Sequence, residues 1–155
     1  MNRDFVEMLF ALCEARAEFL IVGAHALAAY GPPRYTGDID IWIRPTPSNA
    51  ARVLAALREF GAPLSDLTAD DLTRAGTVFQ MGVAPRRIDI LTSISGVVFD
   101  DAWPRRVPLK IEDLEVSTIG RDDFVANKRA AGRPKDLLDI ALLEEFERNR
   151  GLPEK

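Results

Sequence analysis

Two carboxylates separated by a single isoleucine, inside an otherwise apolar run, constrain the fold of this chain more than any other feature. They are Asp38 and Asp40, at the start of the predicted strand Asp38–Ile43. Successive side chains of a strand point to opposite faces, so both acids project together while Ile39 and Ile41 can enter the core. The pattern predicts a buried strand that presents two acids side by side.

Two neighbouring carboxylates repel each other. At about 4 Å and an effective dielectric constant near 20, the repulsion is about 4 kcal/mol. The pair therefore needs a cation, a shared proton or separation by solvent. A divalent ion is the simplest remedy, and oxygen ligands without a nearby thiolate or imidazole cluster favour Mg²⁺ or Mn²⁺ over Zn²⁺. The sequence thus predicts a divalent metal site on Asp38 and Asp40.

A third acid interrupts a second apolar strand. Asp89 lies between two isoleucines in the predicted strand Arg87–Leu91, as Asp40 does in its own strand. An acid in a strand that is otherwise buried needs a partner. We therefore expect Asp38, Asp40 and Asp89 to form one metal-coordinating cluster.

Composition limits the class of protein. The chain has 155 residues, of which 47% are hydrophobic and 28% charged, which predicts one globular domain over residues 1–155. The net charge of −4 argues against nucleic-acid binding by bulk charge, although the cluster of Arg86, Arg87, Arg105 and Arg106 could contact an RNA backbone. With a single cysteine, no long apolar run and no apolar N-terminal core, we expect a cytoplasmic protein that is neither exported nor membrane-spanning.

Hydrophobic periodicity predicts an α/β fold, with a mixed sheet, flanking helices and a helical C-terminal tail. We expect strands at residues 19–22, 38–43, 77–83, 87–91, 107–111 and 115–119. We expect helices at residues 3–17, 25–30, 48–60, 69–74, 122–131 and 134–149. The third and fourth strands alternate across Ala84-Pro85 and predict a hairpin. Thr46 and Gly61 should cap the two ends of helix 48–60, and Thr68 with Asp71 resembles a capping box.

The combination of motifs resembles the nucleotidyltransferase superfamily that includes DNA polymerase beta. It consists of a Gly–small pair at a strand-to-helix turn, Asp-apolar-Asp on the next strand and a third Asp on a later strand. The closer resemblance is to small bacterial AbiEii-type toxin nucleotidyltransferases, which read Gly-Gly-x-Ala-Leu and then Arg-x-Thr-x-Asp-apolar-Asp. Here the segment 23–27 reads Gly-Ala-His-Ala-Leu, and 34–40 reads Arg-Tyr-Thr-Gly-Asp-Ile-Asp. Lys128, followed by Arg133-Pro134-Lys135-Asp136 and Asp139, resembles the family's lysine and Arg-x-(Arg/Lys)-Asp-x-x-Asp.

The resemblance implies a nucleotidyltransferase fold and a metal-dependent enzyme that moves NMP from an NTP to a hydroxyl of RNA, such as a tRNA end, or of a protein. Its setting would be a toxin–antitoxin or phage-defence system, with a cognate antitoxin or toxin as partner. Asp38 and Asp40 would hold Mg²⁺ or Mn²⁺, and Asp89 would complete the site on the side of the acceptor hydroxyl.

The resemblance also assigns the residues that contact phosphate. Lys128 and Arg34 would neutralise the β and γ phosphates, and Thr36 could donate a hydrogen bond. Ala24 offers no hydroxyl where many members have Gly or Ser, so backbone N–H groups after Gly23 would serve instead.

Several alternatives remain open at this point. Lys128 on an exposed helix face would ordinarily be a solvated lysine, and His25 could contact nucleotide or be structural. Asp136 could be catalytic, or could pair with Arg133 or Lys135. The protein could also be an antitoxin that adenylylates a partner toxin, or a domain that binds nucleotide or a partner without turnover. The intact acid triad argues against the last alternative, since clustered acids are costly to keep.

Overall fold

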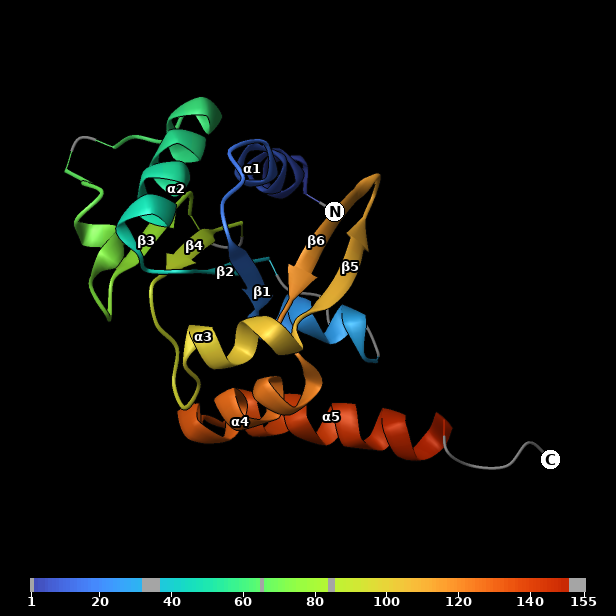
Figure 1. The fold of residues 1–155 in the computed structure, drawn as a ribbon. Helices are drawn as coiled ribbons and strands as arrows, with labels where there is room; N and C mark the ends of the chain where they lie inside the picture. Colours follow the sequence, from blue (N-terminus) through green and yellow to red (C-terminus); the bar gives the residue numbers. More distant parts are fainter. Residues whose placement is uncertain (1, 32–36, 65, 84–85, 151–155) are drawn as a thin grey trace.

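A mixed sheet of six strands, ordered β3-β4-β2-β1-β6-β5, forms the centre of the computed structural model (Figure 1). The structure describes residues 2–31, 37–64, 66–83 and 86–150. The strands are β1 Phe19–Val22, β2 Ile39–Ile43, β3 Val78–Met81, β4 Ile88–Leu91, β5 Val107–Ile111 and β6 Leu114–Thr118. All six lie where the sequence predicted strands, and the α/β class is confirmed.

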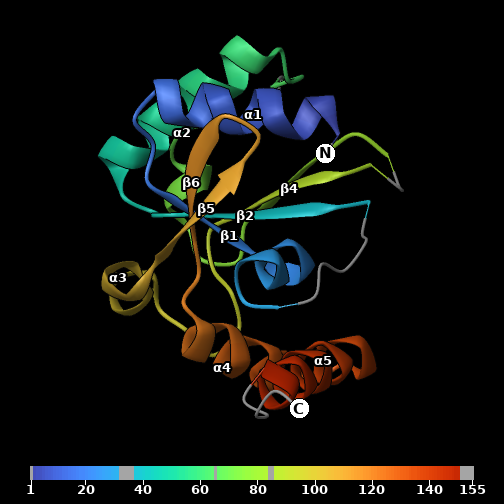
Figure 2. The same ribbon diagram turned by 90° about the vertical axis from the view of Figure 1, so that its right-hand side faces the viewer.

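Helices cover both faces of this sheet, as Figure 2 shows with the sheet between two helical layers. The α-helices are α1 Arg3–Glu14, α2 Pro47–Phe60, α3 Phe99–Ala102, α4 Arg121–Ala131 and α5 Pro134–Arg150. The short 3₁₀ helices are η1 Gly23–Ala29, η2 Asp71–Thr73 and η3 Trp103–Arg105. α1 and α2 lie on one side, whereas α4 and α5 lie on the other and form the predicted helical tail.

Each face of the sheet has its own apolar core, because successive side chains of a strand alternate between faces. In β1, Phe19 and Ile21 pack in the core under α1 and α2. Leu20 and Val22 pack in the core that includes residues of α4 and α5. β1 is therefore buried on both faces, as a central strand between two helical layers must be.

The register between β2 and β4 positions the acids. These strands are parallel, and Asp40 lies directly opposite Asp89. β3 pairs antiparallel with β4, which confirms the predicted hairpin within the described residues. Because directly opposite residues point to the same face, the two carboxylates lie on one side of the sheet. Trp42, two residues beyond Asp40, belongs to the core on the α4–α5 side, so the acids face those helices.

Local sequence signals set several of the helix ends. Thr46 caps α2, and its hydroxyl accepts from the Asn49 N–H. Gly61 ends α2 in the left-handed conformation, as predicted. Thr68 N–H donates to the Asp71 carboxylate and Asp71 N–H donates to the Thr68 hydroxyl, which confirms the reciprocal capping box.

Three predicted helices differ in detail. α1 ends at Glu14, before the expected residue 17, because Arg16 has a positive φ of 57° and Ala17 N–H turns back to the Leu12 carbonyl. The predicted helices 25–30 and 69–74 are the 3₁₀ helices η1 and η2. α3 and η3 were not predicted, because four and three residues are too few to show an apolar period.

Candidate active site

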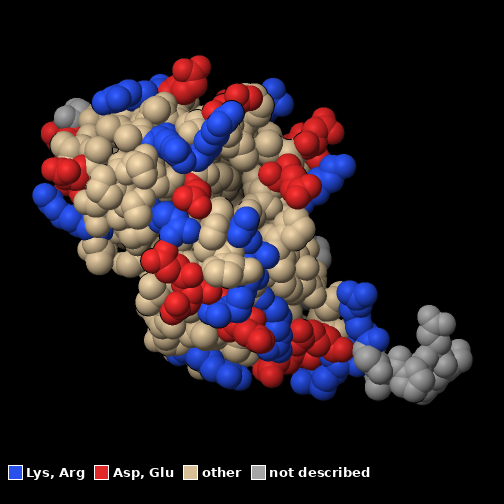
Figure 3. Space-filling view, viewed as in Figure 1, with Lys and Arg blue, Asp and Glu red and all other residues tan. Residues whose placement is uncertain are grey.

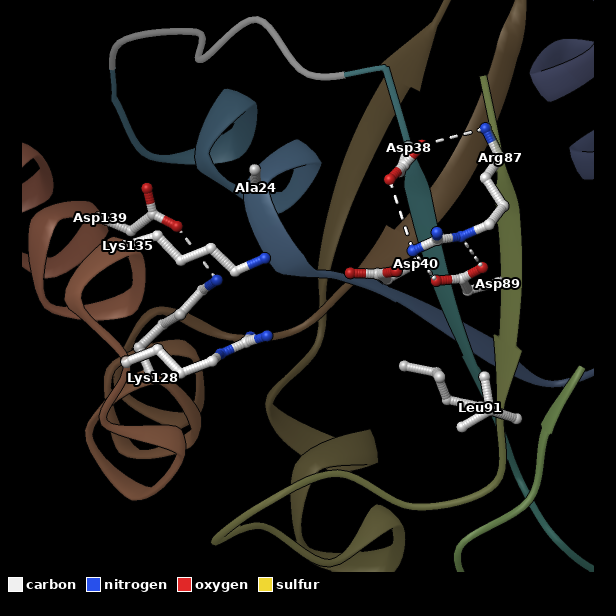
Figure 4. Close-up of a pocket in the computed structure, with 11 residues that line it drawn as sticks. Ala24, Asp38, Asp40, Arg87, Asp89, Leu91, Lys128, Lys135 and Asp139 are labelled. Atoms are coloured by element: carbon white, nitrogen blue, oxygen red, sulfur yellow. Dashed lines mark hydrogen bonds and ion pairs between the residues drawn. The ribbon is translucent and has the colours of Figure 1, made fainter. Parts of the chain in front are cut away.

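A pocket of about 350 Å³ lies between the sheet and the α4–α5 pair (Figure 4). Acidic and basic side chains line it in equal number: Asp38, Asp40, Asp89 and Asp139, with Arg87, Lys128, Arg133 and Lys135. Asp38, Asp40, Asp89 and Arg87 come from the strand side, and the remaining four come from α4, α5 and the turn between them. The predicted acids are therefore brought together on one face.

Gly23 lets the Asp40 carboxylate approach the backbone closely. Gly23 begins η1 directly after β1 and has a positive φ of 68°. A Cβ at this position would fall far inside van der Waals contact with Asp40 Oδ2. Both the backbone conformation and this contact require a residue without a side chain. Ala24, the next residue, lines the pocket, so the predicted Gly–small pair lies at the site.

The Asp40 carboxylate titrates at an unusually high pH. Burial raises its pKa to about 6, and the negative charges of Asp89 and Asp38 add to the rise. Lys128 and Lys135 oppose it from the helical side. The strand side of the pocket thus carries more negative charge than it can easily accommodate, which is the state that a bound cation would relieve.

Arg87 supplies a positive charge within this acidic group. Its guanidinium donates to both oxygens of Asp89, at 2.8 Å from Nε to Oδ1 and 3.2 Å from Nη2 to Oδ2. Nη2 also lies 3.5 Å from Asp38 Oδ2, and the Arg87 backbone N–H donates to Asp38 Oδ1 at 3.0 Å. One arginine therefore joins two of the three predicted metal ligands (Figure 4).

Lys128 lies at the centre of a second ionic network. Its side chain is only 7% exposed, and Nζ lies 3.2 Å from Asp136 Oδ1 and 3.0 Å from Asp139 Oδ2. The expectation of an exposed helix face is wrong, because α5 packs against α4 and encloses this lysine. Lys128 nevertheless reaches the pocket, as the resemblance implied.

Asp136 is fully buried and does not line the pocket. Burial acts to raise its pKa, but hydrogen bonds from Arg133 and Lys128 prevail and hold the pKa at about 2. Arg133 donates to both carboxylate oxygens, at 2.6 Å and 3.1 Å. The contact with Arg133 matches the pairing alternative, and Lys128 is a second partner that was not predicted.

The three acids offer oxygen donors of the kind that Mg²⁺ and Mn²⁺ prefer. Among the described residues, no group of three or more His, Cys, Asp or Glu side chains is drawn together closely enough to hold a metal ion. Two of the predicted ligands, Asp38 and Asp89, form ion pairs with Arg87. The donor chemistry fits a hard divalent ion.

A comparison with protein families identifies the chain. Residues 6–153 match the family model "Nucleotidyl transferase AbiEii toxin, Type IV TA system". The chain belongs to the AbiEii family. It is therefore a nucleotidyltransferase of a toxin–antitoxin family, as the two sequence motifs indicated.

The fold is similar to that of a solved structure. This is the crystal structure of a "putative nucleotidyltransferase" from Thermotoga maritima, which matches with a TM-score of 0.57 and 14% sequence identity. The match covers 96% of this AbiEii chain and 89% of the other. At this identity the similarity shows the fold alone. No curated protein matches the chain.

Two site residues implied by the AbiEii resemblance, Arg34 and Thr36, lie outside the described residues. His25 is partly buried, with its ring edge-on to Phe5 at 5.7 Å. Burial lowers the pKa of His25. A hydrogen bond to the backbone of Asp38 acts to raise this pKa, but burial prevails. These contacts match the structural alternative for His25.

Three cations in the pocket of this AbiEii chain were not predicted as site residues: Arg87, Arg133 and Lys135. Arg87 had a usable signal, since it precedes Asp89 by two residues and so shares its face of the strand. The predicted basic cluster does not act as one free patch, because Arg87 and Arg105 each pair with a buried carboxylate. None of the described helices is long and apolar enough to cross a membrane.

Proposed function

We propose that this AbiEii-family chain transfers NMP from an NTP to a hydroxyl of a tRNA or a protein, with Mg²⁺ or Mn²⁺ bound at Asp38, Asp40 and Asp89. The observation that supports this proposal is the division of the pocket into two walls. The strand wall carries these three acids and Arg87, and the helical wall carries three cations and Asp139 (Figure 4). In a complex of a divalent ion with a triphosphate, the ion would face the acids and the phosphate oxygens would face the cations.

The helical wall is suited to hold the triphosphate. Lys128 is fixed by Asp136 and Asp139, so its ammonium group keeps one position in the pocket. Lys135 is exposed and reaches the same pocket from α5. A triphosphate carries more charge than backbone donors alone can offset, and these cations would neutralise the β and γ phosphates. We assign Arg34, Thr36 and the backbone at Gly23 and Ala24 to the same contact, on the resemblance.

The strand wall is suited to the transfer step. The acceptor oxygen forms a bond to the α-phosphorus, the bond from that phosphorus to the bridging oxygen breaks, and pyrophosphate leaves. A divalent ion held by the acids supplies electrostatic stabilisation to the oxygens on which charge develops. Asp89 lies opposite Asp40 on the adjoining strand, and in this proposal it orients the acceptor hydroxyl and receives its proton. Asp136 acts through Lys128 and Arg133 as a positioning residue.

The proposal is tested by label transfer. Purified protein is incubated with each α-labelled NTP, Mg²⁺ or Mn²⁺, total tRNA and cell lysate, alongside Asp40→Ala. Asp70→Ala is the matched control, because Asp70 is exposed and its side chain makes no cap hydrogen bond. We expect label with the wild type and Asp70→Ala but not with Asp40→Ala.

The labelled species separates the remaining alternatives. Labelled tRNA supports a toxin that modifies RNA, whereas a labelled product of a neighbouring gene supports an antitoxin that adenylylates its partner. If no NTP gives label above the Asp40→Ala background, even with the neighbouring gene product present, the enzyme proposal is replaced by nucleotide or partner binding.

A further inference from the structure

Arg87 is in an unusual position for a residue beside predicted metal ligands. Its guanidinium makes a bidentate pair with Asp89 and also reaches Asp38, while its own side chain is 33% exposed. An ordinary surface arginine would not be expected to contact two of the four acids that line this pocket. The observed contacts give it the position that a metal ion would need.

The geometry points to competition between this guanidinium and a divalent ion. Asp89 has two oxygens, and Arg87 holds both of them. A metal ion at Asp89 would share these oxygens with the guanidinium, which weakens them as ligands, and it would also be repelled by the nearby positive charge. The partial exposure of Arg87 leaves its side chain a path toward solvent.

We propose that Arg87 is an autoinhibitory counter-cation, which pairs with Asp38 and Asp89 and opposes the binding of a divalent ion at these acids. The proposal rests on the proposed function, because it takes those acids as metal ligands. It goes further by assigning this chain an inhibited resting state. The ion pairs of Arg87 with Asp38 and Asp89, here called the latch, maintain that state. The free protein binds metal weakly, and a metal ion delivered together with a triphosphate opens the latch more readily than metal alone.

Mn²⁺ binding to the purified protein tests the latch without any measurement of activity. Free Mn²⁺ is followed by electron paramagnetic resonance during titration of the wild type and Arg87→Gln. We expect Arg87→Gln to bind Mn²⁺ about tenfold more tightly or better, because a repelling charge and a competing pair are both removed.

Arg105→Gln is the matched control. Arg105 makes the same bidentate contact with a buried carboxylate, Asp123, at 2.9 Å for each bond, and it does not line the pocket. The control changes net charge by the same amount, so it should leave Mn²⁺ affinity within about twofold of the wild type. Arg87→Lys keeps the charge without the fork and should give an intermediate affinity. If Arg87→Gln does not fold, Arg87→Lys replaces it as the test variant.

The outcomes distinguish this inference from the proposed function. If the wild type binds Mn²⁺ and neither Arg87 variant binds it more tightly than the wild type and Arg105→Gln, the latch is wrong while the metal site stands. If neither the wild type nor any variant binds Mn²⁺ with or without NTP, the metal site of the proposed function fails and the latch fails with it. Tighter Mn²⁺ binding by Arg87→Gln, and to a smaller extent by Arg87→Lys, but not by Arg105→Gln supports the latch.

Discussion

Replacing Asp40 with asparagine should stabilise the metal-free protein near neutral pH. Burial and two neighbouring acids raise the pKa of this carboxyl to about 6, from an ordinary value of 3.8. The difference corresponds to about 3 kcal/mol, because one pKa unit is about 1.4 kcal/mol. Asp40 is only partly buried, so solvent screening reduces the expected gain in unfolding free energy to about 1–2 kcal/mol.

The gain should depend on pH in a defined direction. A carboxyl with a raised folded-state pKa gives stability that is present below its unfolded pKa and is lost as pH rises through the folded pKa. The asparagine side chain of the variant would mimic the neutral acid at every pH. The advantage of Asp40→Asn should therefore be near zero at about pH 3.5, grow up to about pH 6, and stay constant above it.

Urea unfolding in EDTA at several pH values measures this difference, with Asp70→Asn as the control for an exposed acid. Added Mg²⁺ should then reverse the order, because a bound ion stabilises the wild type and not the variant. An advantage of the same size at about pH 4 and pH 7.5, or a loss of stability at neutral pH, would refute the electrostatic reasoning.

Two further predictions concern the groups around this carboxylate. Gly23→Ala should lower the unfolding free energy by more than about 2 kcal/mol and weaken Mn²⁺ binding, because its Cβ would strike Asp40. Gly61→Ala is the control, because Gly61 also has a positive φ but an added Cβ would meet no atom within 4 Å. This variant should lower the unfolding free energy by only about 1 kcal/mol and leave the Mn²⁺ affinity unchanged. Lys128→Met should abolish calorimetrically measured binding of Mg²⁺–NTP and reduce stability by about 3–5 kcal/mol, because Asp136 loses a buried partner. Unchanged NTP affinity in Lys128→Met would remove the lysine from the site.

The strands were predictable because their signal is local. Apolar residues alternate with Asp40 and with Asp89 in a two-residue period, and this period can be recognised in the sequence without knowledge of the fold. The same period correctly placed both acids on faces that could meet. It could not give the parallel register of β2 and β4, since that pairing depends on a crossover of the chain.

The burial of Lys128 was not predictable for a different reason. Its surroundings are set by the packing of α4 against α5, and the acids that enclose it come from the second helix. A lysine in a polar helical segment reads as solvated until its neighbours are known. Arg87 was misassigned similarly, because its charge suggested surface although its spacing from Asp89 placed it on the site face.

The charges of the pocket are balanced before any ligand arrives, and this balance bears on how the site works. Figure 3 shows the same mixing of signs on the outer surface over α4 and α5. Within the pocket, however, each wall has an excess of one sign: three acids and Arg87 lie on the sheet, and three cations and Asp139 lie on the helices. A metal ion alone would meet Arg87, and a triphosphate alone would meet the acids. A metal ion bound to an NTP would contact both walls, so we expect the two ligands to bind more tightly together than either does alone.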